Sequence, residues 1–366
     1  MDLRLQKLAR VLINYSLGLK PGQLFKISAE PIATPLVLAI YEEALKLGAN
    51  PIVDLGLIDV REILLKYGND EQLTFLSPMR KLEVEELHAQ LTIWATTNTK
   101  NLSNVDPKRQ QLLSRGSRPY LERFFERVGQ GTLKWCGTQY PTEAHAQDAE
   151  MSLREYEDFV YQAGHFHEDD PVAFWRKMEK EQDRLVQMLN QAEQIHLRAA
   201  DTDLTLLVKG RKWINCCGHE NFPDGEIFVS PLEDSVNGHI KFTFPAFYGG
   251  REVAGVRMKY KNGVVVEATA EKDEDYLISM LDTDESARHL GEFAIGTNYE
   301  IQKFTKNTLF DEKIGGTCHL AVGSGFPESG GTNRSAIHWD MVCDLKKGGE
   351  ITADGKVIYR DGKFVI

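Results

Sequence analysis

Five residues in the second half of the chain have side chains that could hold divalent cations. They are two glutamates, two histidines and an aspartate, embedded among glycine, proline, asparagine and apolar residues: Glu226, Glu292, His319, His338 and Asp340. Carboxylate oxygens and imidazole nitrogens are ligands that zinc, cobalt and manganese accept. The chemistry that such a set could support is the binding of a metal that activates water.

The spacing of His338 and Asp340 is the most informative signal. In the string SAIHWDMV the two are two residues apart, so on a β-strand both side chains leave the same face. Ile337, Trp339 and Met341 would then line the other face. An imidazole and a carboxylate on an otherwise apolar strand could form half of a metal site. A hydrogen bond between the two explains the pattern equally well.

The other three candidates also have structural interpretations. Glu226 follows a Pro-Asp-Gly turn and begins a β-branched run, where a solvated strand end is the commoner role. Glu292 lies between Gly291 and Phe293, so it needs a metal or a salt-bridge partner, because an unpaired buried carboxylate is costly. His319 interrupts the strand-like TCHLAV before a Gly- and Ser-rich loop, and a hydrogen-bonded core histidine fits there too.

Taken as a set, the three carboxylates favour two cations over one. A single divalent ion would leave three negative charges around a charge of +2, whereas two ions are nearly balanced once a bridging hydroxide is added. We therefore predict two divalent ions at one site. Three residues just before the strand of His338 are further candidates for contacts to the metal ligands or to a substrate: Asn333, Arg334 and Ser335.

The first half of the sequence alternates helices and strands. Apolar residues at helical spacing predict helices over the first 20 residues, after Pro35, at 80–88 and near 120–128. Short apolar runs between them predict the following strands: 24–27, 51–54, 91–95 and 133–136. This order is typical of a parallel sheet covered by helices, so we predict a doubly wound N-terminal α/β domain over residues 1–192.

The second half is predicted to be different in kind. A polar helix from Pro171 to about Ala192, with Leu185, Met188 and Leu189 turned inward, would join the two halves. After it the chain consists mostly of short β-branched runs, with a hairpin signal at Asn262-Gly263 and a helix at 273–281. Residues 193–366 therefore predict a β-rich α+β domain, and this domain carries the candidate ligands.

Composition and motifs exclude several classes of protein. The 366 residues carry 43 lysines and arginines against 54 aspartates and glutamates, a net charge of −11, which disfavours nucleic acid and anionic membranes as partners. The sequence contains no GxGxxG after a strand, no GxxxxGK[ST], no HExxH and no GxSxG. No secretory signal or 18-residue apolar stretch occurs, and five cysteines without a CxxC fit reduced thiols in the cytoplasm.

Several strings, in this order, resemble the M29 family of metallo-aminopeptidases, of the aminopeptidase T type. The strings are PDGEIFVSPLEDSVNG, GREVAGVRMKYKNGVVVEATA, LGEFAIGTN, GTCHLAVGS and GGTNRSAIHWDMV. KPGQLFKISAEP and ADTDLTLLVKGRKW fit as well, so the resemblance covers nearly the whole chain. It implies an α/β N-terminal domain, a second domain with two divalent ions, and a homodimer that helps to enclose the site.

The resemblance also implies roles for individual residues. By motif the two ions, zinc, cobalt or manganese, would be held by Glu226, Glu292, His319, His338 and Asp340. The family usually has a catalytic tyrosine in the loop after the first of these histidines, and here Phe326 takes that place. A phenylalanine cannot stabilise an oxyanion or assist proton transfer, so the catalytic residue is unknown and the activity is expected to be lower or altered.

The leading hypothesis is thus a cytoplasmic dinuclear aminopeptidase that acts on peptides with a free N-terminus. The first alternative is a dinuclear amidohydrolase for a non-peptide amide, with Phe326 reflecting the changed chemistry. The second is a catalytically silent homologue that binds metal or peptide and lost turnover together with the tyrosine. Hydrolysis of leucyl-p-nitroanilide, compared with its N-acetylated form, would separate the leading hypothesis from both.

Overall fold

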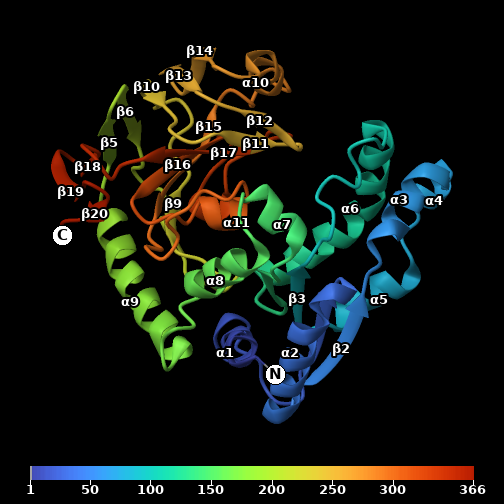
Figure 1. The fold of residues 1–366 in the computed structure, drawn as a ribbon. Helices are drawn as coiled ribbons and strands as arrows, with labels where there is room; N and C mark the ends of the chain where they lie inside the picture. The colour runs from blue at the N-terminus through green and yellow to red at the C-terminus, as the bar shows by residue number, and fades with distance from the viewer. Residues whose placement is uncertain (1) are drawn as a thin grey trace. The chain divides into compact units, whose positions relative to one another are not determined.

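The computed structural model describes residues 2–366, and the chain divides into two compact units (Figure 1). Unit 1 consists of the chain up to Trp175 together with Gly218–Phe222, and unit 2 consists of Arg176–Cys217 and Pro223–Ile366. The division falls inside the helix predicted from Pro171, and a domain boundary at residues 192 and 193 stays a prediction. None of the helices in the described part of the chain combines the length and apolar character that a bilayer crossing requires.

Unit 1 is built on a parallel sheet with the strand order β2-β1-β3-β4-β8. Its strands are β1 (Leu24–Ala29), β2 (Asn50–Leu55), β3 (Ala89–Trp94), β4 (Lys134–Gln139) and β8 (Asn221–Phe222). Its helices are α1 (Leu3–Val11), the π-helical η1 (Leu12–Ser16), the 3₁₀ turn η2 (Pro31–Ala33), α2 (Thr34–Leu47), α3 (Ile58–Tyr67), α4 (Asp70–Thr74), α5 (Pro78–Glu86), α6 (Pro107–Gly129), α7 (Glu143–Asp148) and α8 (Leu153–Ala163). The predicted α/β class is confirmed.

Local sequence explains where most of these helices begin and end. Helix α2 has proline in its first turn and ends at Gly48, which adopts the left-handed conformation (φ 88°). Helix α6 is longer than the prediction near 120–128, since it starts after the N-cap Asp106 and continues through Pro119. A proline inside a helix removes one backbone hydrogen bond, which is why the sequence pattern suggested a helix that starts only beyond it.

Helix α9 (Pro171–Leu189) spans the division between the units, and its inward face differs from the prediction. Leu189 is buried as expected, but Met188 is 36% exposed and Gln182 is buried instead. The Gln182 amide donates to the backbone oxygen of Glu226 at 2.9 Å and accepts from Thr297 Oγ1 at 3.0 Å. These bonds satisfy the amide, so a polar residue can take the inward position.

Unit 2 contains two large antiparallel sheets. The first has the order β14-β13-β10-β6-β5-β18-β19-β20, and its strands are β5 (Gln194–Ala199), β6 (Thr202–Leu207), β10 (Asn237–Lys241), β13 (Arg257–Lys261), β14 (Val264–Thr269), β18 (Glu350–Ala353), β19 (Lys356–Arg360) and β20 (Lys363–Phe364). The second has the order β17-β16-β15-β9-β7, and its strands are β7 (Ile214–Cys216), β9 (Glu226–Val229), β15 (Leu290–Gly296), β16 (Thr317–Gly323) and β17 (His338–Asp344). Smaller elements complete the unit: the β11 (Ala246–Tyr248) and β12 (Arg251–Val253) pair, α10 (Glu274–Leu281), α11 (Thr308–Asp311) and the 3₁₀ turn η3 (Pro327–Ser329).

The predicted features of unit 2 are present. Strands β13 and β14 form the expected hairpin, and Asn262 and Gly263 at its tip both have positive φ (49° and 82°), as a tight hairpin turn requires. The two large sheets share one apolar core. Its members include residues of both: Ile195, Leu204, Ile227, Phe293, Leu320 and Met341. The β-rich α+β class predicted for the second half is therefore confirmed, and Figure 1 shows β9, β15, β16 and β17 side by side.

Candidate metal centre

The predicted ligands lie on one face of the sheet that contains β15, β16 and β17. Residues paired directly across two strands share a face, as do residues two apart on one strand. Ala321 on β16 is paired with Glu292 on one side and with Asp340 on the other. His319 is two residues from Ala321 along β16, so these three ligands share a face.

The remaining two ligands belong to the same face. Glu226, the first residue of β9, is paired with Gly296, which is four residues from Glu292 along β15. His338, the first residue of β17, is two residues from Asp340. The structure therefore brings all five predicted residues together from four strands that are adjacent in the sheet but far apart in the sequence.

The two faces of this sheet have opposite character. The alternate residues of these strands, such as Ile227, Phe293, Leu320 and Trp339, point into the core. On the ligand face, the positions of β15 and β16 between or beside the ligands carry only small residues: Ala294, Gly296, Ala321 and Gly323. Small residues leave the space that the longer ligand side chains need to converge.

Distances within the cluster are short. His319 Nε2 lies 3.4 Å from Glu226 Oε2 and 3.7 Å from Glu292 Oε1. His338 Nε2 lies 3.1 Å from Glu292 Oε2 and 3.5 Å from Asp340 Oδ1. Glu292 thus presents one oxygen to each histidine. Glu226, Glu292 and His319 are buried, with exposed fractions of 6%, 4% and 1%.

A sixth residue, Glu312, joins the cluster and was missed by the sequence analysis. Two of the groups of side chains whose ligand atoms lie within 4.8 Å of one another belong to this cluster: Glu226, Glu312 and His319 form one, and Glu292, His319 and Asp340 form the other. The local sequence Asp-Glu-Lys resembles a solvated charged turn. The signal that could have found Glu312 is its setting between Leu309-Phe310 and Ile314, all of which are buried.

Close backbone approach places Glu312 over the ligand face. The segment 312–315 runs beside the end of β15, where Asn298 donates its backbone N–H to the Lys313 oxygen at 3.0 Å. Gly296 makes this approach possible, because a Cβ there would lie 2.2 Å from the backbone oxygen of Ile314. The segment also carries Lys313, whose ammonium donates to Glu226 Oε1 and to Glu312 Oε2, each at 2.7 Å.

His338 is held in the orientation that a metal ligand needs. Its Nδ1 is 2.8 Å from the backbone oxygen of Ser324, so Nδ1 carries the proton and donates to that oxygen. Its Nε2 is then the nitrogen directed at Glu292 and Asp340. A backbone carbonyl that fixes the tautomer in this way is the usual support of a metal-binding histidine.

The electrostatics of the cluster favour positive charge. Burial opposes protonation of the histidines, but Glu292 and Glu226 raise the pKa of His319 to about 9, and Asp340 and Glu292 raise that of His338 to about 12. Burial would raise the pKa of Glu292, yet the two histidines keep it below its usual value. The pKa of Asp340 is also lowered, against its burial, chiefly by His338. The protonated imidazoles supply positive charge to the surrounding carboxylates. A metal ion that binds an imidazole displaces its proton and can supply this positive charge instead.

Unsatisfied buried atoms show that the residues fit a metal. Within residues 2–366, Glu226 Oε2 and Asp340 Oδ1 are buried without a hydrogen-bond partner. The 3.5 Å from Asp340 Oδ1 to His338 Nε2 is an ion-pair distance but too long for a good hydrogen bond. Orphaned oxygens in a cluster of carboxylates and imidazoles are what a divalent cation would satisfy.

The loop that leads into β17 is tied down by the residues predicted there. Asn333 Nδ2 donates to the backbone oxygens of Ser286 and Gly323, and Ser335 Oγ donates to Asp284 Oδ2 at 2.9 Å. Arg334 is exposed and donates to the backbone oxygens of Gly331 and Asn333. These bonds support a positioning role for Asn333 and Ser335, whereas contacts to a substrate stay a prediction.

Phe326 lies directly against the candidate ligands. Its ring packs on Phe228 with centroids 4.8 Å apart and meets the His338 ring edge-on at 4.9 Å. Its backbone N–H donates to Ser230 Oγ at 2.9 Å. Phe326, the residue that the resemblance places where the family usually has a tyrosine, therefore contacts the histidine of the candidate centre but brings no hydroxyl.

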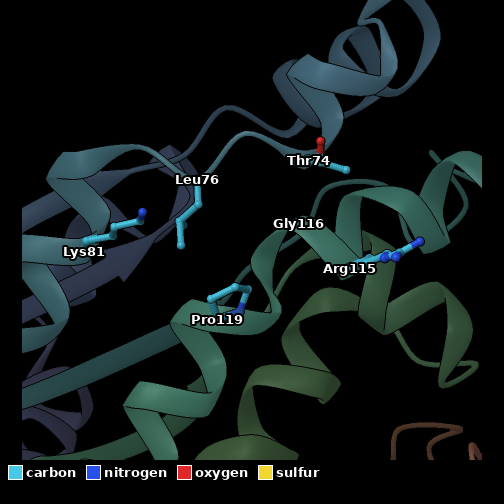
Figure 2. Close-up of a pocket in the computed structure, with 6 residues that line it drawn as sticks. All are labelled: Thr74, Leu76, Lys81, Arg115, Gly116 and Pro119. Atoms are coloured by element: carbon cyan, nitrogen blue, oxygen red, sulfur yellow. The ribbon is translucent and has the colours of Figure 1, made fainter.

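Two cavities differ in their relation to this cluster. A small one of about 30 Å³ is lined by Asp340 and Glu312 together with Phe247 and Phe304, so it opens beside two of the carboxylates. One of about 270 Å³ lies in unit 1, where Figure 2 shows Arg115, Gly116 and Pro119 along α6 and Thr74, Leu76 and Lys81 around them. The side chains that line this larger cavity offer no histidine, cysteine or carboxylate as a metal ligand.

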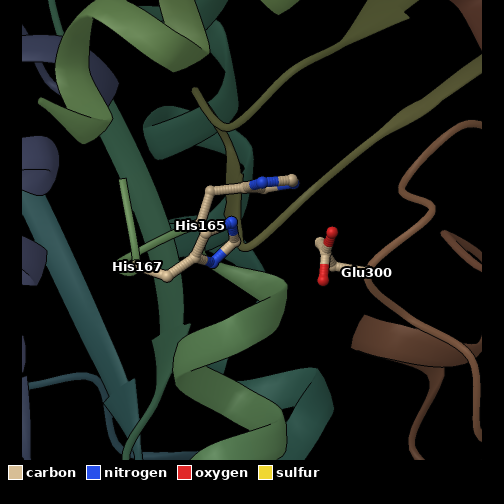
Figure 3. Close-up of side chains that lie close together, drawn as sticks. All are labelled: His165, His167 and Glu300. Atoms are coloured by element: carbon tan, nitrogen blue, oxygen red, sulfur yellow. The ribbon is translucent and has the colours of Figure 1, made fainter. Parts of the chain in front are cut away.

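A pair of histidines in unit 1 is set in a different environment. The rings of His165 and His167 are 5.6 Å apart (Figure 3). His165 stacks on Phe174 at 3.9 Å and meets Trp175 edge-on at 5.8 Å. Its packing among aromatic rings is that of a structural histidine. Within the described part of unit 1, no three histidine, cysteine or acidic side chains of that unit form a ligand group.

Comparison with known proteins places the chain in a family. Aminopeptidase 2 of Geobacillus stearothermophilus is 29% identical over 407 aligned residues, which cover 98% of this chain and 97% of the relative. Aminopeptidase T of Thermus aquaticus is 28% identical and covers 99% and 98%. The solved structure of wild-type AmpT from Thermus thermophilus has the same two-domain α/β fold, with a TM-score of 0.86, 24% identity and coverage of 99% of both chains.

The family assignment itself comes from the whole sequence. Residues 1–364 match the profile of the peptidase family M29, described as thermophilic metalloprotease. Membership implies a divalent metal cofactor, and the candidate centre offers the ligand types for one. The resemblance noted from the motifs is thereby confirmed: the chain belongs to the M29 family of metallo-aminopeptidases.

Proposed function

We propose that this chain removes N-terminal residues from peptides and that two divalent ions, zinc, cobalt or manganese, are bound at the cluster described above. The observation that carries the proposal is the shared face of β9, β15, β16 and β17, on which two groups of ligand atoms overlap at His319. The proposed ligands are the five predicted residues and one more: Glu226, Glu292, His319, His338, Asp340 and Glu312. Such ions supply a hydroxide at neutral pH and polarise the scissile carbonyl.

The residues of the chain have distinct parts in this proposal. Glu292 faces His319 with one oxygen and His338 with the other, so it would hold metal together with both histidines. Ser324 holds His338 with Nε2 directed at the cluster. A substrate with a free α-amine could bind through that amine as well as through its carbonyl, which would explain a requirement for a free N-terminus.

The direct test is hydrolysis of leucyl-p-nitroanilide by protein that is stripped with chelator and reloaded with zinc, cobalt or manganese. The N-acetylated compound is the control, since it lacks the free amine. Metal-dependent release from the free amine alone is the expected result. Release from both compounds would favour the amidohydrolase alternative, and no release with any metal would contradict the proposed activity.

A variant pair tests the ligand set separately from turnover. His338→Ala removes a proposed ligand and is expected to lower the content of bound metal after equilibrium dialysis, measured by mass spectrometry. His239→Ala is the matched control, because His239 is exposed on β10 in the other sheet of the same unit. Equal metal content in both variants and the wild type would remove His338 from the ligand set.

A catalytically silent homologue is the second candidate function, and Phe326 is the observation that favours it. Its ring touches His338 where the family tyrosine would provide a hydroxyl. The silent homologue would bind metal with normal stoichiometry and hydrolyse neither compound. Strong turnover by the wild-type protein would rule it out.

We also propose that the chain forms a homodimer and works in the cytoplasm. Three apolar side chains of the edge strand β2 are 42% to 43% exposed: Ile52, Val53 and Leu55. An uncovered apolar edge strand is a surface that gains from association. All five cysteines are free thiols. Cys318 and Cys343 lie opposite each other on the neighbouring strands β16 and β17 and still form no disulfide, which supports a reducing compartment. Light scattering during size-exclusion chromatography would measure the mass against 41.4 kDa for one chain.

A further inference from the structure

Lys313 is a lysine buried among the carboxylates of the candidate centre. Its exposed fraction is 2%, and its ammonium donates to Glu226 Oε1 and Glu312 Oε2 at 2.7 Å each. Both partners are also largely buried, with side chains 7% and 16% exposed. A buried ammonium is stable only when it is paired, so these two bonds fix the geometry of all three side chains.

The Lys313 ammonium binds only one of the two carboxylate oxygens of Glu226. Oε1 is held by Lys313, whereas Oε2 is buried without a hydrogen-bond partner and lies 3.4 Å from His319 Nε2. One oxygen is therefore left for a cation. Glu312 also gives one oxygen, Oε2, to the same ammonium.

The net charge of the cluster also indicates that Lys313 belongs to the metal centre. Glu312 adds a fourth carboxylate to the three that the sequence analysis counted, and Lys313 cancels its charge. The net charge of the proposed ligands and the ammonium is then three negative charges, which two divalent ions and one hydroxide balance. Without Lys313 the same set would carry one negative charge too many.

We propose that Lys313 is a positioning residue of the metal centre: it occupies one oxygen of Glu226 and one of Glu312, so that each carboxylate binds an ion through a single oxygen. This inference rests on the proposed function. Its consequence is that coordination positions stay open for substrate, as catalytic metal sites require.

Lys313→Met tests this role, because methionine has a similar length and no charge. We expect the variant to bind cobalt in the wild-type amount but with weaker visible absorption, since carboxylates that bind through both oxygens raise the coordination number. We expect kcat for leucyl-p-nitroanilide to fall about 10- to 100-fold, as is typical for the outer partners of metal ligands, with a much smaller change in KM.

The matched control is Lys26→Met. Lys26 is also 2% exposed and also bridges two carboxylates, Asp54 at 3.1 Å and Glu83 at 2.9 Å, but all three residues belong to unit 1. This variant should lose stability without any change in the cobalt spectrum or in kcat. Lys313→Arg keeps the positive charge and should recover part of the kcat and of the absorption.

Two results would overturn the proposal. One is a Lys313→Met protein whose cobalt spectrum and kcat equal those of the wild type. The other does not depend on the folding of any variant: a crystal structure of the zinc-loaded wild-type protein in which Nζ of Lys313 has left Glu226 and Glu312. If instead the wild-type protein bound no metal or hydrolysed no substrate, the proposed function would fail first, so the two failures are distinguishable.

Discussion

Phe326 is the residue at which this chain departs from the pattern that its resemblance implies. Its ring fills a place between Phe228 and His338, and its backbone is held by Ser230. The shape of the loop is therefore kept by contacts that do not need a hydroxyl. What is absent is a group that could donate a hydrogen bond to a developing oxyanion.

Phe326→Tyr should restore that group. We expect kcat for leucyl-p-nitroanilide to rise by about 10²- to 10³-fold, the range measured for a single oxyanion donor, with little change in KM. Steady-state kinetics on the zinc-loaded protein would measure the effect, and thermal unfolding would check that the added oxygen is tolerated. An unchanged kcat would mean that the wild-type protein does not depend on a hydroxyl at this position.

At the scale of elements, the ligand face depends on small residues as much as on the ligands themselves. Ala321 is paired with both Glu292 and Asp340 and is fully buried between them. A larger side chain there would occupy the space into which the ligands converge, although a β-branched residue suits a strand.

Ala321→Val should therefore lower metal affinity while the protein stays folded. We expect a decrease of about 10-fold or more in zinc affinity by titration calorimetry, since ligands forced apart lose their geometry. Val322→Ile is the control, because it adds a carbon to the opposite, core-facing side of the same strand. The idea of a shared ligand face would fail if the two variants bound zinc equally well.

A second feature at this scale joins the segments that lead into β15 and β17. Asp284, just before β15, accepts hydrogen bonds from the backbone N–H of Ala336 at 2.7 Å and from Ser335 Oγ at 2.9 Å. These bonds, the Ala336 N–H first, lower the pKa of Asp284 below 3.8. The carboxylate thus anchors the loop that delivers His338.

Asp284→Asn should destabilise the protein by about 1 kcal/mol at pH 7, at the low end for bonds to a charged group because the carboxylate is partly exposed. The folded-state pKa is lowered, so this stabilisation is present above the unfolded pKa and is lost as the pH falls through the folded value. Urea unfolding of both proteins at pH 7 and near pH 3 would measure it. A difference between the two proteins that stayed constant over this range would contradict the role of the charge.

At the scale of the whole molecule, the cluster is a concentration of buried acids that needs cations. Four carboxylates converge there, and Lys313 offsets only one of them. Protonated His319 and His338 offset part of the remaining charge in the metal-free protein, and a cation that binds only the folded state stabilises that state by mass action.

Removal of metal should therefore lower the unfolding temperature. Saturation at 100 times Kd contributes about 2.7 kcal/mol per ion, which corresponds to roughly 5 to 10 °C for a unit of this size. Differential scanning calorimetry with chelator, and again after zinc is returned, would measure the shift and its recovery. Equal unfolding temperatures with and without metal would argue against a structural contribution of the ions.

Several properties were determined by the sequence alone because they depend on neighbouring residues. Alternation of apolar and polar positions indicated that His338 and Asp340 share a face, and Asn262-Gly263 indicated a hairpin. The helix–strand order of the first half predicted the parallel sheet of unit 1. The types of the five ligands predicted from the sequence, and with them the family, were also evident from short motifs.

Only the tertiary structure decided which of these side chains meet. Strand register placed Ala321 opposite both Glu292 and Asp340, and register depends on pairing between distant segments. Glu312 and Lys313 joined the cluster because Gly296 lets their backbone pass close to β15, a contact that leaves no periodic signal in the sequence. From its sequence, the Asp-Glu-Lys segment has the composition of a solvated turn. In the tertiary structure Glu312 and Lys313 are largely buried, and this burial brings their charges next to the other proposed ligands.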